Sequence, residues 1–276
     1  MTASHLDRLA PDLDAAGGEV SVWCGRADGT PVWTRLPDQQ HYAASTMKLP
    51  VLVAAHRRAA AGALDLDAAV PVHNEFASVH DGSTYSLDRA EDSDDQVWDA
   101  IGTSRPLSWL TQRMIVRSSN LATNLVLDQV GVAAVAEALD ACGSTATTVA
   151  RGIEDYQARD HGLDNMVTAP GLAAVLVALS AERAADPAAC KEILDVCAAN
   201  EWNDGIPAGL PAGTRVCHKN GWQNRVCHDA ALVQPADAEP FVLVVLTTTD
   251  LERAAADALI ARIAAAAYTD LTGCRP

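Results

Sequence analysis

The feature that most limits the fold is the position of the strand-like segments, which fall into two groups far apart in the chain. Segments 20–25 and 31–36 precede a long intervening region, and segments 214–218, 230–234 and 241–248 follow it. Their β-branched and aromatic residues, with turn-forming residues between them, are typical of strands. A single sheet is therefore expected to draw its strands from both ends of the chain.

The intervening sequence has the periodicity of helices. We expect an α+β fold in which a five-stranded sheet is flanked by terminal helices and carries an inserted all-helical lobe. It should form one domain over residues 1–276, with an α/β lobe (1–40 plus 200–276) and a helical lobe (41–199). The segments expected to be helical are 3–16, 49–63, 107–116, 121–130, 132–141, 171–185, 191–199 and 254–267.

The first candidate for chemistry is Ser45-Thr46-Met47-Lys48, which directly precedes the alanine-rich helix 49–63. Residues i and i+3 share one face of a helix, so Lys48 is expected to point its amine at the Ser45 hydroxyl. A serine becomes a nucleophile when a base takes its proton, and a desolvated lysine can be that base. Alternatively, Ser45 is a helix N-cap and Lys48 is a solvated residue of the first turn.

The charge of the chain disfavours two classes of partner. A formal net charge of −16 opposes binding to nucleic acid and to anionic membrane surfaces, so neither is expected. A small anionic substrate remains compatible, because Lys48 and Lys219 can reverse the field locally. No pattern indicates a cofactor, and the oligomeric state is not encoded in a readable way.

The N-terminal residues carry acids where a signal peptide has its apolar core, and no apolar run reaches transmembrane length. We expect a soluble cytoplasmic protein, or a secreted one if a leader has been removed. The seven cysteines are odd in number and irregularly spaced, which favours reduced, buried thiols. Cys217-His218 and Cys227-His228 could face each other as metal ligands, but their spacing fits no common zinc pattern, so no metal is expected.

Two further motifs occur at the junctions of the expected lobes. The first is Ser118-Ser119-Asn120, and the second is His218-Lys219-Asn220-Gly221-Trp222. Taken singly, Ser118 and Asn120 could be a polar pair at a helix start, and Asn220-Gly221 could be a turn.

Together with Ser45-x-x-Lys48, these motifs resemble, in order and placement, the three active-site motifs of the class A β-lactamases and of related penicillin-binding proteins. The resemblance spans nearly the whole chain. It implies an antiparallel sheet and the fold of the serine β-lactamases and DD-peptidases, with no cofactor and a small amide or ester as substrate.

The resemblance also implies roles for individual residues. Ser45 would form an acyl-enzyme, and Lys48 would hold or relay its proton. Ser118 would pass a proton to the departing nitrogen, assisted by Lys219. For substrate binding, it implies that Asn120 holds a side-chain amide, Asn220 faces the carboxylate, Gly221 allows close approach, and Trp222 completes with Ser45 an oxyanion hole of backbone N–H groups.

The sequence departs from the family at three positions. Ser119 stands where the family usually has an aspartate that supports the fold. Asn220 stands where the family has threonine or serine, which puts recognition of the β-lactam carboxylate in doubt.

The third departure concerns the base that activates water to release the acyl group. In the loop from Arg151 to Thr168-Ala-Pro170, the family's glutamate position falls on Ile153, and Glu154 is its neighbour. Glu154 is the candidate base. Alternatively, Glu154 or Asp155 pairs with Arg151 or Arg159 to brace the loop.

The expected activity is that of a serine hydrolase which opens the cyclic amide of β-lactams through an acyl-enzyme on Ser45. One alternative is an esterase, peptidase or transacylase that uses the same nucleophile on another substrate. Another is a penicillin-binding protein that is acylated with little turnover.

Overall fold

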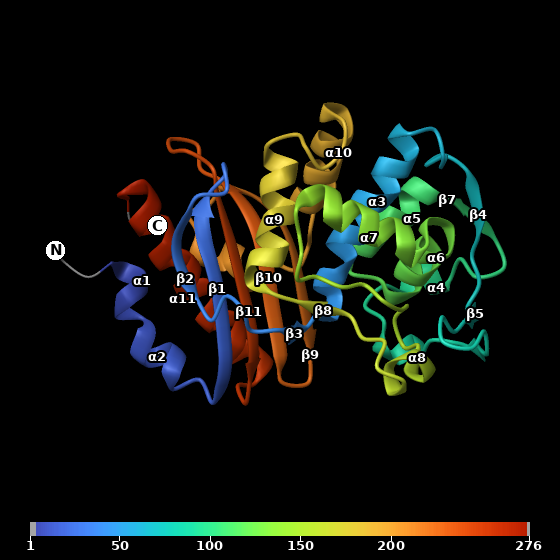
Figure 1. The fold of residues 1–276 in the computed structure, drawn as a ribbon, viewed down its shortest axis with the longest axis horizontal. Helices are drawn as coiled ribbons and strands as arrows, with labels where there is room; N and C mark the ends of the chain where they lie inside the picture. Colours follow the sequence, from blue (N-terminus) through green and yellow to red (C-terminus); the bar gives the residue numbers. More distant parts are fainter. Residues whose placement is uncertain (1–3, 275–276) are drawn as a thin grey trace.

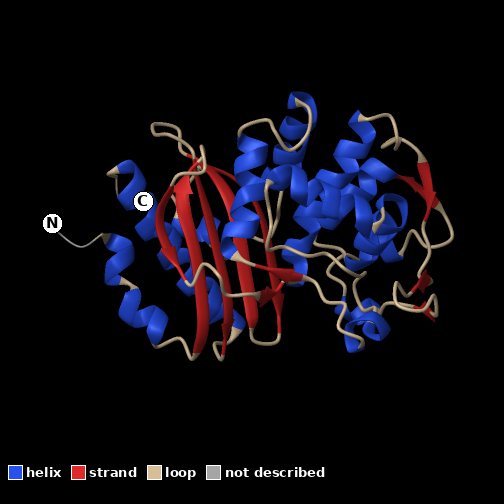
Figure 2. Ribbon diagram, in the orientation of Figure 1, coloured by secondary structure: helices blue, strands red, loops and turns tan. Residues whose placement is uncertain are grey.

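The two groups of strands meet in one antiparallel sheet, which confirms the expected architecture. In the computed structural model, which describes residues 4–274, the strand order is β2-β1-β11-β10-β9 (Figures 1 and 2). The central pair joins distant sequence, because β1 pairs with β11 from Gly18 opposite Thr249 to Arg26 opposite Phe241. The strands are β1 (Gly18–Arg26), β2 (Pro31–Arg35), β9 (Arg215–Gln223), β10 (Val226–Gln234) and β11 (Phe241–Thr249).

Helices cover both faces of this sheet (Figure 1). On one face, Val20 and Val22 of β1 pack with α11 (Arg253–Thr272), while α9 (Ala169–Ser180) packs on the other face. Burial on both faces explains why β11 is apolar at six successive positions, from Phe241 to Leu246. α1 (His5–Arg8), α2 (Ala10–Asp14) and the 3₁₀ helix η3 (Ile206–Gly209) lie on the α11 side. None of the described helices, α11 included, has the combined length and apolar character needed to cross a bilayer.

The second lobe is built around α3 (Lys48–Ala60), whose first nine residues are all buried. The 3₁₀ helix η1 (Ala44–Met47) leads directly into α3, so the sequence Ser45 to Lys48 enters the centre of this lobe. The other helices are η2 (Arg89–Glu91), α4 (Asp95–Trp98), α5 (Leu107–Val116), α6 (Asn120–Val130), α7 (Val132–Cys142), α8 (Tyr156–Asp160) and α10 (Pro187–Ala198).

This lobe is not all-helical, which corrects one expectation. Three small antiparallel ladders lie within residues 41–167, each too short for a periodic signal in the sequence. They pair β3 (His41–Tyr42) with β8 (Met166–Val167), β4 (Ala69–Pro71) with β7 (Ser104–Pro106), and β5 (Phe76–Ala77) with β6 (Thr84–Tyr85).

The expected helix 3–16 is also wrong in detail, within its described part. It is divided into α1 and α2, and α2 begins around Pro11, which lacks the N–H that a continuous helix requires. The two Cys-His pairs do not face each other, because Cys217 lies opposite Leu232 and Cys227 lies opposite Trp222.

Candidate active site

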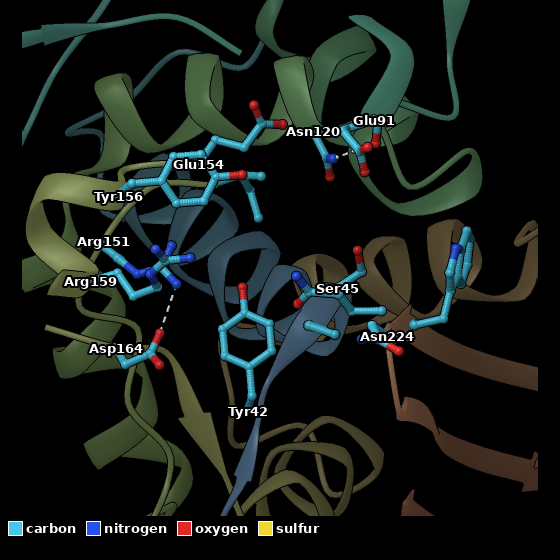
Figure 3. Close-up of a pocket in the computed structure, with 14 residues that line it drawn as sticks. Tyr42, Ser45, Glu91, Asn120, Arg151, Glu154, Tyr156, Arg159, Asp164 and Asn224 are labelled. Carbon is cyan, nitrogen blue, oxygen red and sulfur yellow. Dashed lines mark hydrogen bonds and ion pairs between the residues drawn. The ribbon is translucent and has the colours of Figure 1, made fainter. Parts of the chain in front are cut away.

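A cleft of about 560 Å³ opens between the two lobes, with Ser45 on its floor (Figure 3). It is bordered by β3, by η1, by the first residue of α6, by loop 151–164 and by residues 222–224 at the end of β9. The cleft therefore gathers segments from both lobes at the place where the sequence motifs were expected to meet.

Ser45 does not cap a helix. Neither η1 nor α3 has a side-chain cap hydrogen bond at its start, and the Ser45 side chain is partly exposed to the cleft. The preceding residue, Ala44, has φ +44°, a left-handed conformation that non-glycine residues rarely adopt. Such strain persists where the surrounding structure fixes the backbone, as is common beside reactive groups.

Lys48 is fully buried, so it is not a solvated residue of the first turn. Its Nζ donates hydrogen bonds to the Ser118 carbonyl at 2.7 Å, to Asn120 Oδ1 at 2.8 Å and to Ser118 Oγ at 3.3 Å. None of these three bonds goes to Ser45, which differs from the expected direction of the amine. Burial lowers the pKa of Lys48 well below its ordinary value, and the nearby Lys219 lowers it further. Both effects favour the uncharged form of the Lys48 amine, and the Asp92 carboxylate opposes them.

Ser118 lies in the turn between α5 and α6, with φ +60°. Its Oγ accepts hydrogen bonds from Lys48 Nζ and, at 3.1 Å, from Lys219 Nζ. A hydroxyl has two acceptor lone pairs and one proton. Because two amines occupy the lone pairs, the Ser118 proton remains available to donate to a third group.

Lys219 approaches Ser118 from β9, on the other lobe, and is fully buried. It also donates to the Asn220 carbonyl at 2.8 Å. Burial lowers the pKa of Lys219 to about 7, against the opposing effect of the Asp229 carboxylate on β10. Its charge is therefore sensitive to pH near neutrality.

Gly221 lies at the closest approach of β9 to η1. A Cβ at this position would lie 2.7 Å from Ser45 N and 3.0 Å from Thr46 N, which only a glycine avoids. Asn220 and Gly221 are part of the strand, not of a turn. The next residue, Trp222, borders the cleft and stacks on Arg253, with 3.8 Å between the guanidinium carbon and the ring centroid.

The Asn220 amide is engaged within the protein. Its Oδ1 accepts from Asn200 Nδ2 at 3.4 Å and from Lys219 Nζ at 3.3 Å, while its Nδ2 donates to the Trp202 carbonyl at 3.4 Å. The residue is 8% exposed. The described hydrogen bonds of the amide therefore all go to other residues of the protein.

Loop 151–164 presents an apolar residue to the cleft. The side-chain amide of Asn124, on α6, binds both backbone groups of Ile153. Asn124 Oδ1 accepts from the Ile153 N–H at 2.7 Å, and Asn124 Nδ2 donates to the Ile153 carbonyl at 2.9 Å. The Ile153 side chain borders the cleft. The position at which the family has its glutamate is therefore rigidly held and carries no acid.

Glu154 also borders the cleft, but its carboxylate points away from Ser45 (Figure 3). Its Oε2 accepts a hydrogen bond from the Asp88 N–H at 2.9 Å. Partial burial raises the pKa of Glu154 above its ordinary value. Its backbone has φ +60°, a third strained residue beside the cleft.

The loop is not braced by the acid–arginine pairs that the sequence suggested. Arg151 pairs instead with Asp164 at 2.7 Å, and Arg159 with its neighbour Asp160 at 2.8 Å. Asp155 accepts from Ser78 Oγ at 2.8 Å and from the Val79 N–H at 3.0 Å, so it ties the loop to another segment.

Sequence reasoning missed several residues that shape the site. Tyr42, directly before the Ser45 run, projects its ring into the cleft, and Tyr156 lies across from it (Figure 3). The acidic segment 91–95 is partly enclosed, since Asp94 is 3% exposed and pairs with Arg113. Adjacency to Ser45 could have identified Tyr42, but no local signal marks Asn124. Residues 4–274 contain no group of three or more potential metal ligands.

Comparisons with known proteins agree with this fold. A model of the beta-lactamase enzyme family matches residues 2–271. A β-lactamase from Xanthomonas campestris has 22% identity and a TM-score of 0.83, over 98% of this chain and 99% of that chain. For a β-lactamase from Sphaerobacter thermophilus the values are 22% and 0.80, over 99% and 98%.

The protein PBP-A is 19% identical with a TM-score of 0.79, over 96% of this chain and 94% of that chain. At these identities the structural likeness establishes the fold alone. No curated protein sequence was found to match.

Proposed function

Since this chain belongs to the beta-lactamase enzyme family, we propose that it is a serine hydrolase of the class A type that forms an acyl-enzyme on Ser45 with β-lactams. The observation that carries the proposal is the Ser118 hydroxyl, held between the buried amines of Lys48 and Lys219. Ser45, Asn120 and Trp222, from the same three motifs, line the cleft. The proposed substrate is a small molecule, with no nucleic acid or membrane as partner.

In acylation, Ser45 Oγ attacks the amide carbonyl and its proton passes to neutral Lys48. The C–N bond then breaks as the nitrogen takes the Ser118 proton, and Lys48 returns a proton to Ser118. Lys219 holds one lone pair of Ser118 Oγ, so the hydroxyl proton faces the leaving group. Protons balance within this relay.

The developing oxyanion would be stabilised by the backbone N–H groups of Ser45 and Trp222, at roughly 3 kcal/mol per donor. The absence of a side chain at Gly221 allows β9 to approach Ser45 N closely enough for both donors to serve one oxygen. Asn120 borders the cleft and would hold the amide of the substrate side chain.

The described conformation supports deacylation less well than acylation. For Glu154 to activate water, its carboxylate must leave the Asp88 N–H and turn toward Ser45. Ile153 cannot take or give a proton. We therefore expect acylation to be faster than release, so that acyl-enzyme accumulates.

Two observations favour a second candidate, a relative that acts on other esters or amides or is acylated with little turnover. One is the apolar Ile153 at the position of the family's base. The other is the engaged amide of Asn220, which offers little to a carboxylate beside the scissile bond.

A chromogenic cephalosporin, a fluorescent penicillin and intact mass spectrometry separate these functions. Turnover that is lost in Ser45→Ala supports the first. A persistent adduct on Ser45 without turnover, or ester hydrolysis that depends on Ser45 without any adduct, supports the second. Activities that Ser45→Ala leaves unchanged contradict the mechanism.

A further inference from the structure

We propose that Asp92, outside all three sequence motifs, is the positioning residue for the Ser118 turn and supplies from a separate loop the carboxylate that position 119 lacks. Its effect on acylation rests on the proposed function. Its effect on the geometry of the turn and on Lys48 does not.

One carboxylate oxygen of Asp92 accepts hydrogen bonds from three residues. Oδ2 accepts from Ser119 Oγ at 3.2 Å, from the Leu121 N–H at 2.8 Å and from Trp98 Nε1 at 2.9 Å. The other oxygen, Oδ1, accepts from the Asp94 N–H at 3.1 Å. A carboxylate held by four donors is a fixed group, not a solvated one.

The two neighbours of Asp92 hold the same turn. The Glu91 carbonyl accepts from Asn120 Nδ2 at 2.9 Å. Ser93 Oγ approaches the Arg117 carbonyl at 2.6 Å and the Ser118 carbonyl at 3.3 Å. Three consecutive residues, 91–93, therefore contact every residue of the turn from 117 to 121.

The turn requires such support because Ser118 is a non-glycine residue at φ +60°. Residues in this conformation relax unless their surroundings fix them. Relaxation of the turn would move Ser118 Oγ away from Lys48 and Lys219, which hold it at 3.3 and 3.1 Å. Asp92 thus acts on the relay through backbone position and does not contact a reacting atom.

Asp92 also acts through its charge. The charged groups that act on Lys48 are Lys219, from β9, and Asp92, from the loop before α4. Lys219 lowers the pKa of Lys48, and Asp92 raises it. Asp92 therefore limits the loss of basicity that burial imposes on Lys48.

The contacts of Ser119 show how Asp92 can supply the carboxylate that position 119 lacks. Ser119 caps α6 by accepting from the Ala122 N–H at 3.1 Å, and its hydroxyl donates to Asp92. Aspartate is an equally good N-cap. An exchange of the two side chains, Asp92→Ser with Ser119→Asp, should keep one carboxylate and one hydroxyl in contact.

The test compares Asp92→Ser, Asp92→Asn and the double variant Asp92→Ser/Ser119→Asp with the wild-type chain, by single-turnover acylation with a fluorescent penicillin. We expect Asp92→Ser to slow acylation at least tenfold and the double variant to return to within threefold of wild type. Asp92→Asn keeps an acceptor oxygen but loses the charge, so it should lower the pKa of Lys48. The acid limb of the pH profile of the acylation rate should therefore move to lower pH by about one unit.

A second readout does not depend on acylation. The chain has three lysines, Lys48, Lys191 and Lys219, so lysine labelled with ¹³C at Cε gives three signals to titrate by NMR. Asp92→Asn should lower the titration midpoint of Lys48 and leave that of the exposed Lys191 unchanged.

The outcomes separate the two proposals. If no β-lactam or ester acylates the wild-type protein, the proposed function is wrong. The Lys48 titration still tests the role of Asp92 in that case. Three results would overturn the inference. They are an acylation rate of Asp92→Ser equal to that of wild type, a double variant that is acylated no faster than Asp92→Ser, and a Lys48 titration midpoint that Asp92→Asn leaves unchanged. If Asp92→Ser does not fold, Asp92→Asn and the double variant decide it.

Discussion

The Glu154 carboxylate accepts a hydrogen bond of 2.9 Å from the Asp88 backbone N–H. Its second oxygen, Oε1, is buried and has no hydrogen-bond partner within residues 4–274. A buried carboxylate oxygen without a donor favours the protonated acid, in line with the raised pKa of Glu154. The position of the Glu154 carboxylate thus opposes its use as a base in the conformation described.

Ile153→Glu should restore a base at the position that Asn124 holds rigidly toward the cleft. We expect deacylation of the Ser45 adduct to be at least tenfold faster, because general-base catalysis typically contributes 10²–10⁴-fold. The decay of the adduct in intact mass spectra measures it. Ile153→Gln is the matched control, with a similar shape and no base. Equal acceleration by Gln would mean that access of water, not basicity, had changed.

Glu154→Gln tests whether Glu154 leaves Asp88 during the reaction. A glutamine can keep the Asp88 contact through its amide oxygen but cannot take a proton. We expect acylation to be unchanged and deacylation to slow at least tenfold, which would trap the acyl-enzyme. An unchanged rate of deacylation would remove Glu154 from the mechanism and leave it a loop-bracing residue.

Lys219→Met should stabilise the fold while it impairs acylation. The pKa of Lys219 in the folded state is about 7, below that of an unfolded lysine, so the unfolded state binds the extra proton above pH 7. Wild-type stability should therefore rise from pH 7 to about 8.5, beyond which unfolded thiols ionise and oppose the rise.

Below pH 7 the buried Lys219 ammonium destabilises the folded state, and Lys219→Met should raise the free energy of unfolding by about 2 kcal/mol. That gain corresponds to roughly 4–8 °C in Tm for a domain of this size. Thermal unfolding at pH 6 and pH 8.5 measures both effects, with Lys191→Met as the exposed control. A Tm difference that does not shrink at the higher pH would contradict the assignment.

Gly221→Ala should disrupt the approach of β9 to η1, because the new Cβ would lie 2.7 Å from Ser45 N. We expect acylation to fall about 100-fold, as found when one oxyanion donor is lost, with a smaller effect on stability. The control is Gly131→Ala between α6 and α7, which meets no atom within 4 Å but has φ +77° and therefore bears only backbone strain. Equal losses of acylation in both variants would argue against a local effect at Ser45.

Asn220→Thr should favour substrates that carry a carboxylate next to the scissile bond. Threonine cannot reach the partners of the Asn220 amide, and its hydroxyl would take the place found in the family. We expect acylation by a penicillin to increase roughly tenfold relative to hydrolysis of a neutral ester, the effect of one or two hydrogen bonds. Asn220→Ala controls for the loss of the amide. If Ala gives the same ratio as Thr, the hydroxyl does not bind the carboxylate.

The sheet could be predicted from sequence because its strands carry local signals. β11 is apolar from Phe241 to Leu246, and the helix predicted for 107–116 has the bounds of α5. β9 was predicted too short, since Lys219 and Asn220 do not resemble strand residues. Their polar side chains are tolerated there because Lys219 binds Ser118 of the other lobe and the Asn220 amide binds Asn200 and Trp202.

The site was less predictable, because its key contacts join residues distant in sequence. The i, i+3 spacing predicted that the Lys48 amine points at Ser45, but Nζ binds the Ser118 carbonyl and Asn120, 70 or more residues away. Asn124 and Asp92 act through the same kind of long-range contact. Their sequence neighbourhoods contain nothing that distinguishes them from surface residues.

The pairing of β1 with β11 has a consequence for the order of events during synthesis. When Ser45 leaves the ribosome, 180 residues separate it from the start of β10 and 195 from the start of β11, and the sheet cannot close until both strands are made. Lys219 and Gly221 also arrive late. A nascent chain should therefore carry an inert serine, and reagents that label Ser45 should not label ribosome-bound chains that stop before β11.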